Sequence, residues 1–340
     1  MAIIEATALS KTYQNAVKEA GLAGALKHFI KPVFTEIKAV SEVRLSIEPG
    51  ETVAYVGPNG AGKSTTIKML TGILKPSGGQ IRINGMDPYR DRLENTKRMG
   101  VVFGQRTQLW WDIPVSESFT LLRDIYAIPP NRYKENLAWL SDMLGLGPFM
   151  GSSARKLSLG QRMRADLALA FLHDPAVVFL DEPTIGLDVA VRERIREFLK
   201  QINRERGTTI LLTSHDLDDI RDVCDRLVVI DRGTIIYDGK LQALLDQCVR
   251  CRTMHLRLAS DGRDFAKKIG KHPDLEVIAS GPCEASIEFD RFALSAKDII
   301  NLANSTGEVV DFRIDEPDIE RFIKNVYEGK LDISENRGRA

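Results

Sequence analysis

A glycine-rich octapeptide, Gly57-Pro58-Asn59-Gly60-Ala61-Gly62-Lys63-Ser64, constrains the fold of this chain more than any other feature. It follows the apolar run 53–56 and opens a helical pattern over 63–70. The spacing matches G-x-x-x-x-G-K-[ST], and a strand before it with a helix after it is the context that this motif requires. Backbone N–H groups of such a loop surround an anionic phosphate, and the helix N-terminus adds partial positive charge. The sequence therefore predicts a P-loop nucleotide-binding fold.

Two side chains of the octapeptide are expected to carry its chemistry. Lys63 is predicted to hold the β- and γ-phosphates, and Ser64 to bind Mg²⁺. Thr65, the next residue, is placed with them among the nucleotide-binding residues. A chance glycine turn is the alternative, and the Gly-Lys-Ser sequence at this spacing argues against it.

The composition excludes some classes of protein. The chain has 340 residues, enough for about two domains, and its Lys plus Arg and Asp plus Glu both number 47, so the formal net charge is zero. That balance gives no support for broad nucleic-acid binding. Four cysteines favour a reducing, cytosolic setting over a disulfide scaffold. No stretch approaches the ~18 apolar residues of a membrane span, and the N-terminus lacks the pattern of a signal peptide, so any membrane role is expected to be peripheral.

The chain beyond the octapeptide alternates short apolar runs with longer helical patterns. Continuous apolar runs suit parallel strands that are covered on both faces. The fold class is therefore α/β with a mostly parallel sheet. The predicted strands are 53–56, 177–180, 210–213 and 227–230, and the predicted helices include 63–70, 159–172 and 191–205.

Two further regions depart from this alternation. A mainly helical stretch at about 116–150 indicates a helical subdomain, about 106–165, inserted into the domain 1–245. Residues 246–330 are predicted to form a small ferredoxin-like α+β domain, because their predicted order, strand-helix-strand-strand-helix-strand, is the order of elements in that motif. Its expected elements are strand 253–259, helix 262–271, strands 275–279 and 285–289, helix 295–305, strand 309–314 and a closing helix 317–327, followed by a charged tail 331–340.

The predicted strand 177–180 runs into two acids, Asp181 and Glu182. A carboxylate at the carboxyl end of such a strand holds Mg²⁺ in P-loop enzymes, and this role is predicted for Asp181. Glu182, on the opposite side of the strand, is predicted to act as the general base that polarises the attacking water. The alternative is that these acids only cap a strand; a phosphate loop, however, requires a metal ligand elsewhere in the chain.

The pentapeptide Leu157-Ser158-Leu159-Gly160-Gln161 precedes the acidic strand. Ser158 stands where helix 159–172 begins, so its hydroxyl and the free N–H groups of the first turn form a second anion site. Two anion sites in one chain suit a nucleotide that is shared between two protomers in a head-to-tail pair. A plain capped helix is the alternative.

Read in order, these motifs resemble the ATP-binding subunit of an ABC transporter, over about residues 1–245. The resemblance rests on 57–64, Gln105, 157–161, 177–182, Gly186-Leu187-Asp188 and His215. It implies ATP and Mg²⁺ as cofactors, with Gln105 binding Mg²⁺ and sensing a membrane subunit. Gln108 keeps the glutamine assignment open, because Gly104 replaces the usual aromatic residue directly before Gln105.

The same resemblance implies roles for residues near the nucleotide. Ser158 and Gly160 would contact the γ-phosphate bound by the partner chain, and Asp188 would lie at the dimer seam. Gln161 is placed with them among the nucleotide-binding residues. His215 would orient the γ-phosphate and the water, where the alternative is a structural histidine. Tyr13 would stack on adenine, although a single aromatic residue is commonly part of a core.

The resemblance also implies the partners and the function. The chain would be an ATPase at the cytoplasmic face of a membrane, working with permease subunits and a second ATP-binding subunit, most simply as a homodimer. The C-terminal domain and the Gly-Leu-Asp sequence resemble the drug and polysaccharide export branch. A soluble ABC protein acting on ribosomes or DNA, and an importer ATPase, remain the alternatives.

Three features stand outside these motifs. An insert at about 14–37 carries an apolar stripe and basic neighbours, which suits a helix on a membrane or partner, or one packed on its own domain. Trp110 and Trp111 would anchor a permease contact, or pack in the interior. Cys248, Cys251, His255 and Cys283 could hold zinc, although the segment has the character of an ordinary linker. In the insert, the apolar stripe consists of Leu22, Leu26, Phe29, Ile30 and Val33, and the basic neighbours are Lys18, Lys27 and Lys31.

Overall fold

A computed structural model describes residues 2–16, 34–104, 106–244, 251–269, 272, 275–306 and 309–315. The chain divides into two compact units between Gly239 and Lys240. The sequence pattern placed this boundary near 245.

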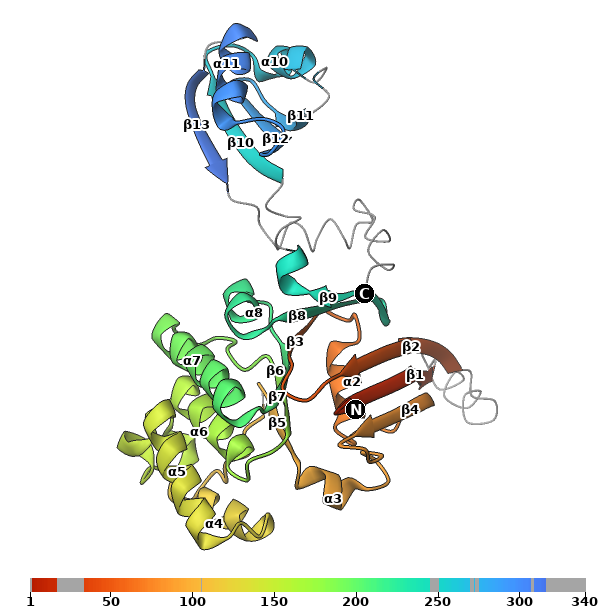
Figure 1. The fold of residues 1–340 in the computed structure, drawn as a ribbon, viewed down its shortest axis with the longest axis vertical. Coiled ribbons are helices and arrows are strands. Elements are labelled where there is room, and N and C mark those ends of the chain that lie inside the picture. The colour runs from red at the N-terminus through yellow and green to blue at the C-terminus, as the bar shows by residue number, and fades with distance from the viewer. Residues whose placement is uncertain are drawn as a thin grey trace, which may run out of the picture. The chain divides into compact units, whose positions relative to one another are not determined.

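A six-stranded sheet forms the centre of the first unit, with strand order β5-β6-β7-β3-β8-β9 (Figure 1). The neighbouring pairs from β5 to β8 are parallel, which confirms the predicted mostly parallel sheet. Every residue of β3 and β7 is buried, as expected for apolar runs covered on both faces. The strands are β3 Thr52–Val56, β5 Met99–Phe103, β6 Val177–Asp181, β7 Thr209–Thr213, β8 Arg226–Asp231 and β9 Thr234–Lys240.

Helices cover this sheet on both sides. In Figure 1, α2 lies on one side, while α5, α6 and α7 gather on the other. The three predicted helices are present with ends within two residues of the expected ones, as α2 Lys63–Leu70, α6 Leu159–Phe171 and α7 Val189–Arg206. The inserted helical segment consists of α4 Val115–Ile125 and α5 Pro130–Leu144, two short 3₁₀ turns and the start of α6; α3 Arg92–Thr96 and α8 Leu217–Val223 complete the unit.

An antiparallel sheet in the order β2-β1-β4 packs beside α2, and the sequence pattern did not predict it. Its strands are β1 Ile4–Ala16, β2 Phe34–Ile47 and β4 Gly78–Ile83. Both ends of the expected insert at 14–37 are therefore strand, because β1 runs to Ala16 and β2 starts at Phe34. The amphipathic stripe between them lies outside the described residues.

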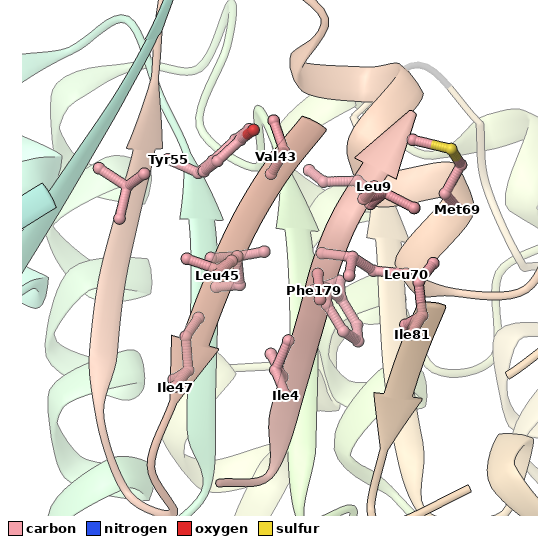
Figure 2. Close-up of a cluster of buried hydrophobic side chains, with 14 of the residues drawn as sticks. Ile4, Leu9, Val43, Leu45, Ile47, Tyr55, Met69, Leu70, Ile81 and Phe179 are labelled. Carbon is pink, nitrogen blue, oxygen red and sulfur yellow. The ribbon is translucent and has the colours of Figure 1, made fainter. Parts of the chain in front are cut away.

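The main hydrophobic core lies between the two sheets of the first unit (Figure 2). Side chains from the antiparallel sheet meet β3, β6 and α2 there, so this core seats the loop between β3 and α2 on a rigid base. The labelled members are Ile4, Leu9, Val43, Leu45, Ile47, Tyr55, Met69, Leu70, Ile81 and Phe179.

The second unit is a four-stranded antiparallel sheet in the order β11-β12-β10-β13, with two helices. The order of elements along the chain confirms the predicted ferredoxin-like pattern. Met254, Leu256, Ile287 and Ile299 belong to its own buried core. Its elements are β10 Cys251–Leu258, α10 Gly262–Ile269, β11 Leu275–Ser280, β12 Glu284–Asp290, α11 Ala296–Thr306 and β13 Val309–Asp315. The expected closing helix 317–327 and the tail lie outside the described residues.

Candidate active site

The phosphate loop, residues 57–64, connects β3 to α2 and passes close to neighbouring strands. A Cβ atom on Gly57 would lie 2.2 Å from the carbonyl oxygen of Ile230, and one on Gly62 would lie 2.5 Å from that of Ala39. Gly62 also has a φ of +108°, which favours glycine. The fold therefore requires glycine at both positions, independently of any phosphate.

The Lys63 side chain folds back over this loop. Its Nζ donates to the carbonyl oxygens of Gly57 at 2.5 Å and Pro58 at 3.3 Å. Burial lowers the pKa of Lys63, and the carboxylates of Glu182 and Asp181 oppose that shift. The amine is thus a buried cation whose hydrogen bonds go to backbone oxygens, and phosphate oxygens can replace these acceptors.

Asp181 ends β6 next to the start of α2. Its Oδ1 accepts from Thr213 Oγ1 at 2.8 Å and from Ser64 Oγ at 3.5 Å. A hydroxyl and a carboxylate are the hard oxygen ligands that Mg²⁺ prefers. The pair Ser64 and Asp181, which the sequence predicted as metal ligands, therefore fits Mg²⁺ in its chemistry and in its proximity.

Glu182 follows β6 with a strained backbone and a histidine partner. Its φ is +57°, a conformation that costs a non-glycine residue free energy and is held only by its surroundings. The Glu182 N–H donates to Thr213, at 3.1 Å to the carbonyl oxygen and 3.0 Å to Oγ1. Glu182 Oε1 lies 3.0 Å from His215 Nε2. The structure thus brings together two residues that are 33 positions apart and were predicted for the same reaction.

The environment of Glu182 favours proton transfer. Burial raises its pKa, while the nearby His215 and Lys63 oppose the rise. A carboxylate with a raised pKa is a stronger base than an exposed one, and its proton affinity lies closer to the working pH. The geometry and the pKa are therefore both suited to a general base.

The pentapeptide 157–161 forms the N-terminus of α6. Ser158 Oγ accepts from the Gln161 N–H at 3.2 Å, and Gln161 Oε1 accepts from the Ser158 N–H at 2.9 Å. This reciprocal capping box satisfies two of the free donors of the first turn. The Ser158 hydroxyl can still donate to a ligand. Gln161 has a local structural role that the sequence analysis did not anticipate, and its contact with nucleotide stays a prediction.

The sequence 186–188 lies beside this helix start. Asp188 caps α7 by accepting from the Val191 N–H at 2.9 Å. A Cβ on Gly160 would lie 3.2 Å from the Val191 side chain, so the first turns of α6 and α7 are neighbours. Large apolar side chains stay exposed around them: Leu159, Ile185 and Val189 at 45%, 47% and 66% of their surface. Such a patch is typical of a protein–protein contact.

Tyr13 lies on β1 and is not part of the core. Its ring is 38% exposed, and Lys11 Nζ lies 5.4 Å from the ring centroid. An exposed ring that carries a cation nearby can receive an adenine base. The core alternative for Tyr13 is therefore not what the structure has, while stacking on adenine remains a prediction.

Gln105 lies outside the described residues. Gly104 and Gln108, which is the alternative glutamine for this role, are described. The Gly104 N–H donates to the Asp181 carbonyl oxygen at 2.8 Å, so the segment passes directly beside the acidic strand. Gln108 Nε2 donates to the Val101 carbonyl oxygen at 2.7 Å. The side chain of Gln108 is thus bound to the protein scaffold, which favours Gln105 as the metal-sensing glutamine.

Asp166, on α6, holds the chain that follows Gln105. Its Oδ1 accepts from Thr107 Oγ1 at 2.9 Å and from the Gln108 N–H at 2.7 Å. The side chain is buried, and burial raises the pKa of Asp166 to about 6, against the effect of these hydrogen bonds. A buried carboxylate therefore joins α6 to the segment that carries Trp110 and Trp111.

The raised pKa of Asp166 predicts a specific pH dependence of stability. The folded chain binds a proton at Asp166 up to about pH 6, while the unfolded chain releases it near 3.8, so this carboxyl lowers stability as the pH rises from 4 to 6. When the pH rises from 5 to 7.5, the free energy of unfolding of the wild type should fall by about 1.4 kcal/mol more than that of Asp166→Asn. Urea unfolding of the two proteins at both pH values measures this difference; equal losses would contradict the assignment.

Trp110 and Trp111 lie at the surface, not in the interior. They are 40% and 49% exposed. The guanidinium carbon of Arg162 lies 4.9 Å from the Trp111 ring centroid, and the Trp110 N–H donates to Ser118 Oγ at 3.2 Å. The Trp111 indole thus lies against Arg162 of α6, and the Trp110 backbone is bound to α4. Both side chains stay exposed, which excludes the alternative of buried packing.

The possible zinc ligands are not brought together by the described structure. His255 Nδ1 lies 2.8 Å from Ser286 Oγ, and Nε2 lies 2.9 Å from Asp315 Oδ2, so both ring nitrogens already have partners. In the described residues, no group of three His, Cys, Asp or Glu side chains could hold a metal. Cys248 and the side chain of Cys251 lie outside the described part, and Cys283 is an exposed free thiol.

Three polar residues that organise the site were not among those predicted from the sequence. Thr213 binds both Asp181 and Glu182, Asp166 holds the segment after Gln105, and Asp219 is buried on α8 with 1% of its surface exposed. Each is a polar residue at a position where the local pattern is apolar or helical. That mismatch is the one signal that could have singled them out.

The comparisons with known proteins agree with this geometry. Residues 40–185 match the protein family described as ABC transporter. The chain is 36% identical over 210 residues, which are 62% of this chain and 85% of the other, to the ABC transporter ATP-binding protein NatA of Bacillus subtilis. The linearmycin resistance ATP-binding protein LnrL of the same organism is 26% identical over 87% of this chain and 96% of its own.

Solved structures are similar as well. One is the dimeric, post-hydrolysis ATP-binding cassette MJ0796 bound to ADP and Pi, with a TM-score of 0.58 and 27% identity over 70% of this chain and 98% of that one. Relatives named for sulfate/thiosulfate import and for methionine import also match the sequence. No helix in the described ranges is long and apolar enough to cross a membrane. The phosphate loop, the acidic strand and these similarities lead to one conclusion: the chain belongs to the ATP-binding proteins of ABC transporters, and it is an ATPase subunit that powers transport.

Proposed function

We propose that two copies of this chain close over two molecules of ATP and Mg²⁺, and that this motion drives export through separate membrane permease subunits. The observation that carries the catalytic part is the contact between Glu182 and His215, 3.0 Å apart, beside Lys63 and Asp181. A base, its partner, a phosphate-binding cation and a metal ligand meet there from three places in the chain: the end of β6, the start of α2 and the segment after β7.

The chemistry follows from these positions. Backbone N–H groups of 57–64 and the Lys63 ammonium bind the β- and γ-phosphates and neutralise charge that develops on the γ-phosphoryl oxygens. Ser64, Asp181 and Gln105 would hold Mg²⁺, which when bound would supply further neutralisation of that charge. Glu182 accepts the proton of the attacking water as the bond between the γ-phosphorus and the bridging oxygen breaks, and His215 holds Glu182 and the γ-phosphate in place.

The second copy supplies the other side of each site. In the described residues, the Ser158 hydroxyl and N–H bond to Gln161, the Ser158 carbonyl oxygen accepts from the Arg162 N–H, and no hydrogen bond joins 157–161 to the phosphate loop of the same chain. The N-terminus of α6 is an exposed anion site, and it is flanked by the exposed apolar side chains Leu159, Ile185 and Val189. A head-to-tail pair buries this patch and places Ser158 and Gly160 on the partner's γ-phosphate, with Asp188 at the seam.

The permease would dock on Trp110 and Trp111, which places this chain at the cytoplasmic face of the membrane. We expect Trp110→Ala/Trp111→Ala to lose the complex with the permease, because two exposed aromatic anchors are removed. Coexpression and affinity purification measure it. Phe292→Ala is the matched control, since Phe292 is 68% exposed on the second unit. Retention of the permease by the double variant would refute this docking site.

Export is supported by the similarity to LnrL, which covers 87% of this chain and so extends into the C-terminal unit. Import is the second candidate, because relatives named for import match the same sequence. The purified permease complex in lipid discs separates the two. We expect it to hydrolyse ATP without any external binding protein; a complex that is silent until such a protein is added would assign import.

A further inference from the structure

Asp219 is a buried carboxylate that the chemistry above does not use. It lies on α8, four residues after His215, with 1% of its surface exposed. Its Oδ2 accepts hydrogen bonds from the hydroxyls of Thr184 and Ser214, the latter at 2.9 Å. Its Oδ1 lies 3.4 Å from Arg196 Nη1, on α7. One carboxylate therefore binds three separate elements.

The two hydroxyls belong to the segments that carry the reacting groups. Thr184 is two residues after Glu182, and the Leu187 N–H donates to its carbonyl oxygen at 3.2 Å, which continues the chain toward Asp188. Ser214 directly precedes His215, and its Oγ also accepts from the Asp216 N–H at 3.0 Å. Asp219 thus joins the segment after β6, which begins with Glu182, to the segment after β7, which carries His215.

Both of these residues depend on their backbone for position. Glu182 is held at a φ of +57°, and such a conformation persists only when neighbouring contacts determine it. The His215 side chain is 51% exposed. Within the described part of the chain, the polar contact of the His215 ring is the one with the Glu182 carboxylate, at 3.0 Å. The ring position is therefore set by the backbone at 214–215, which Asp219 anchors through Ser214.

We propose that Asp219 is a positioning residue, which links the loops after β6 and β7 so that His215 and Glu182 meet over the γ-phosphate. The inference rests on the proposed roles of Glu182 and His215. It concerns the geometry of the reacting groups and not the binding of nucleotide, because in the described residues the hydrogen bonds and the ion pair of the Asp219 carboxylate go to Thr184, Ser214 and Arg196 and not to the phosphate loop 57–64. A loss of this link therefore changes kcat for ATP hydrolysis and leaves the affinity for ATP unchanged.

The first test is Asp219→Ala in the full chain, with ATPase rates and nucleotide affinity measured at saturating protein concentration. We expect kcat to fall roughly 10- to 100-fold, because displacement of a catalytic group by about 1 Å has effects of this size. The KM for ATP and the Kd for ADP should stay within about twofold of wild type, since the binding groups are untouched. Asp219→Asn keeps an acceptor for the hydroxyls and is expected to retain more activity than Asp219→Ala.

Asp222→Ala is the matched control. Asp222 is on the same helix and contacts the same arginine, at 3.2 Å from Arg196 Nε, but it is 40% exposed and binds neither hydroxyl. It should leave kcat unchanged. If Asp219→Ala fails to fold, Thr184→Val/Ser214→Ala removes the two donors and leaves the carboxylate paired with Arg196. That variant should lower kcat to the same extent.

The second test separates positioning from a general loss of stability. If Asp219 acts through His215, then Asp219→Ala should cause little further loss of kcat when it is added to His215→Ala. Losses that multiply would overturn the proposal, as would an unchanged kcat or a rise in KM that accounts for the whole effect. Failure of the proposed function is distinguishable, because Glu182→Gln and His215→Ala would then themselves retain turnover.

Discussion

Glu182→Gln is expected to bind ATP normally and to lose hydrolysis by at least about 100-fold, the contribution of a well-placed general base. The amide has the shape of the carboxylate and can keep the contact with His215 Nε2, which lies 3.0 Å from Glu182 Oε1 in the wild type. The amide cannot, however, accept the proton of the attacking water. The phosphate contacts of Lys63 and of the loop 57–64 are not altered. Phosphate release and equilibrium binding of labelled ATP measure the two properties separately.

The same variant should accumulate as a closed dimer in ATP, because hydrolysis normally opens the pair. Size-exclusion chromatography with and without ATP and Mg²⁺ detects it. Glu135→Gln is the matched control, because it makes the same Glu-to-Gln change at an exposed position on α5. This variant should hydrolyse ATP at the wild-type rate. A Glu182→Gln protein that hydrolyses ATP at the wild-type rate would remove Glu182 from the role of base.

Ser158→Arg is expected to abolish ATP-dependent closure while each chain still binds nucleotide. The residue lies exposed at the N-terminus of α6 and caps it together with Gln161, so the substitution removes the cap and fills the space that the partner's γ-phosphate needs. We expect no ATP-trapped dimer when it is combined with Glu182→Gln, and ATPase activity should fall roughly 10- to 100-fold because the shared site no longer assembles.

The lost helix cap requires its own control. Ser158→Ala removes the same hydroxyl, at a cost of about 1 kcal/mol in stability, but adds no bulk. It should weaken closure without abolishing it, whereas binding of ATP to the monomer should be equal in both variants. Normal closure by Ser158→Arg, or ATPase activity that does not depend on protein concentration, would contradict a site shared between two chains.

The candidate site was predictable wherever its chemistry lies in consecutive residues. The phosphate loop 57–64, the acids Asp181 and Glu182 and the pentapeptide 157–161 all depend on short-range backbone geometry: a strand end, a tight turn, the first turn of a helix. Spacing alone reports such geometry. The glycine positions illustrate it, since Gly57 and Gly62 leave no room for a side chain beside Ile230 and Ala39.

The polar support of the site was not predictable in this way. Thr213, Asp166 and Asp219 bind partners that are 32, 58 and 35 positions away along the chain, and no local pattern records such a pairing. The same reason explains the unexpected antiparallel sheet. β1 and β4 pair across more than sixty residues, and alternation in β1 is interrupted by irregular pairing with β2.

Sequence alone determined the α/β class, the mostly parallel sheet, the ferredoxin-like order of the second unit and the residues of the phosphate loop, because each follows from local periodicity or from a motif of fixed spacing. The tertiary structure decided that Glu182 and His215 touch and that Trp110 and Trp111 are exposed. These are contacts and exposures, which arise only when distant segments pack together and exclude water from some side chains but not from others.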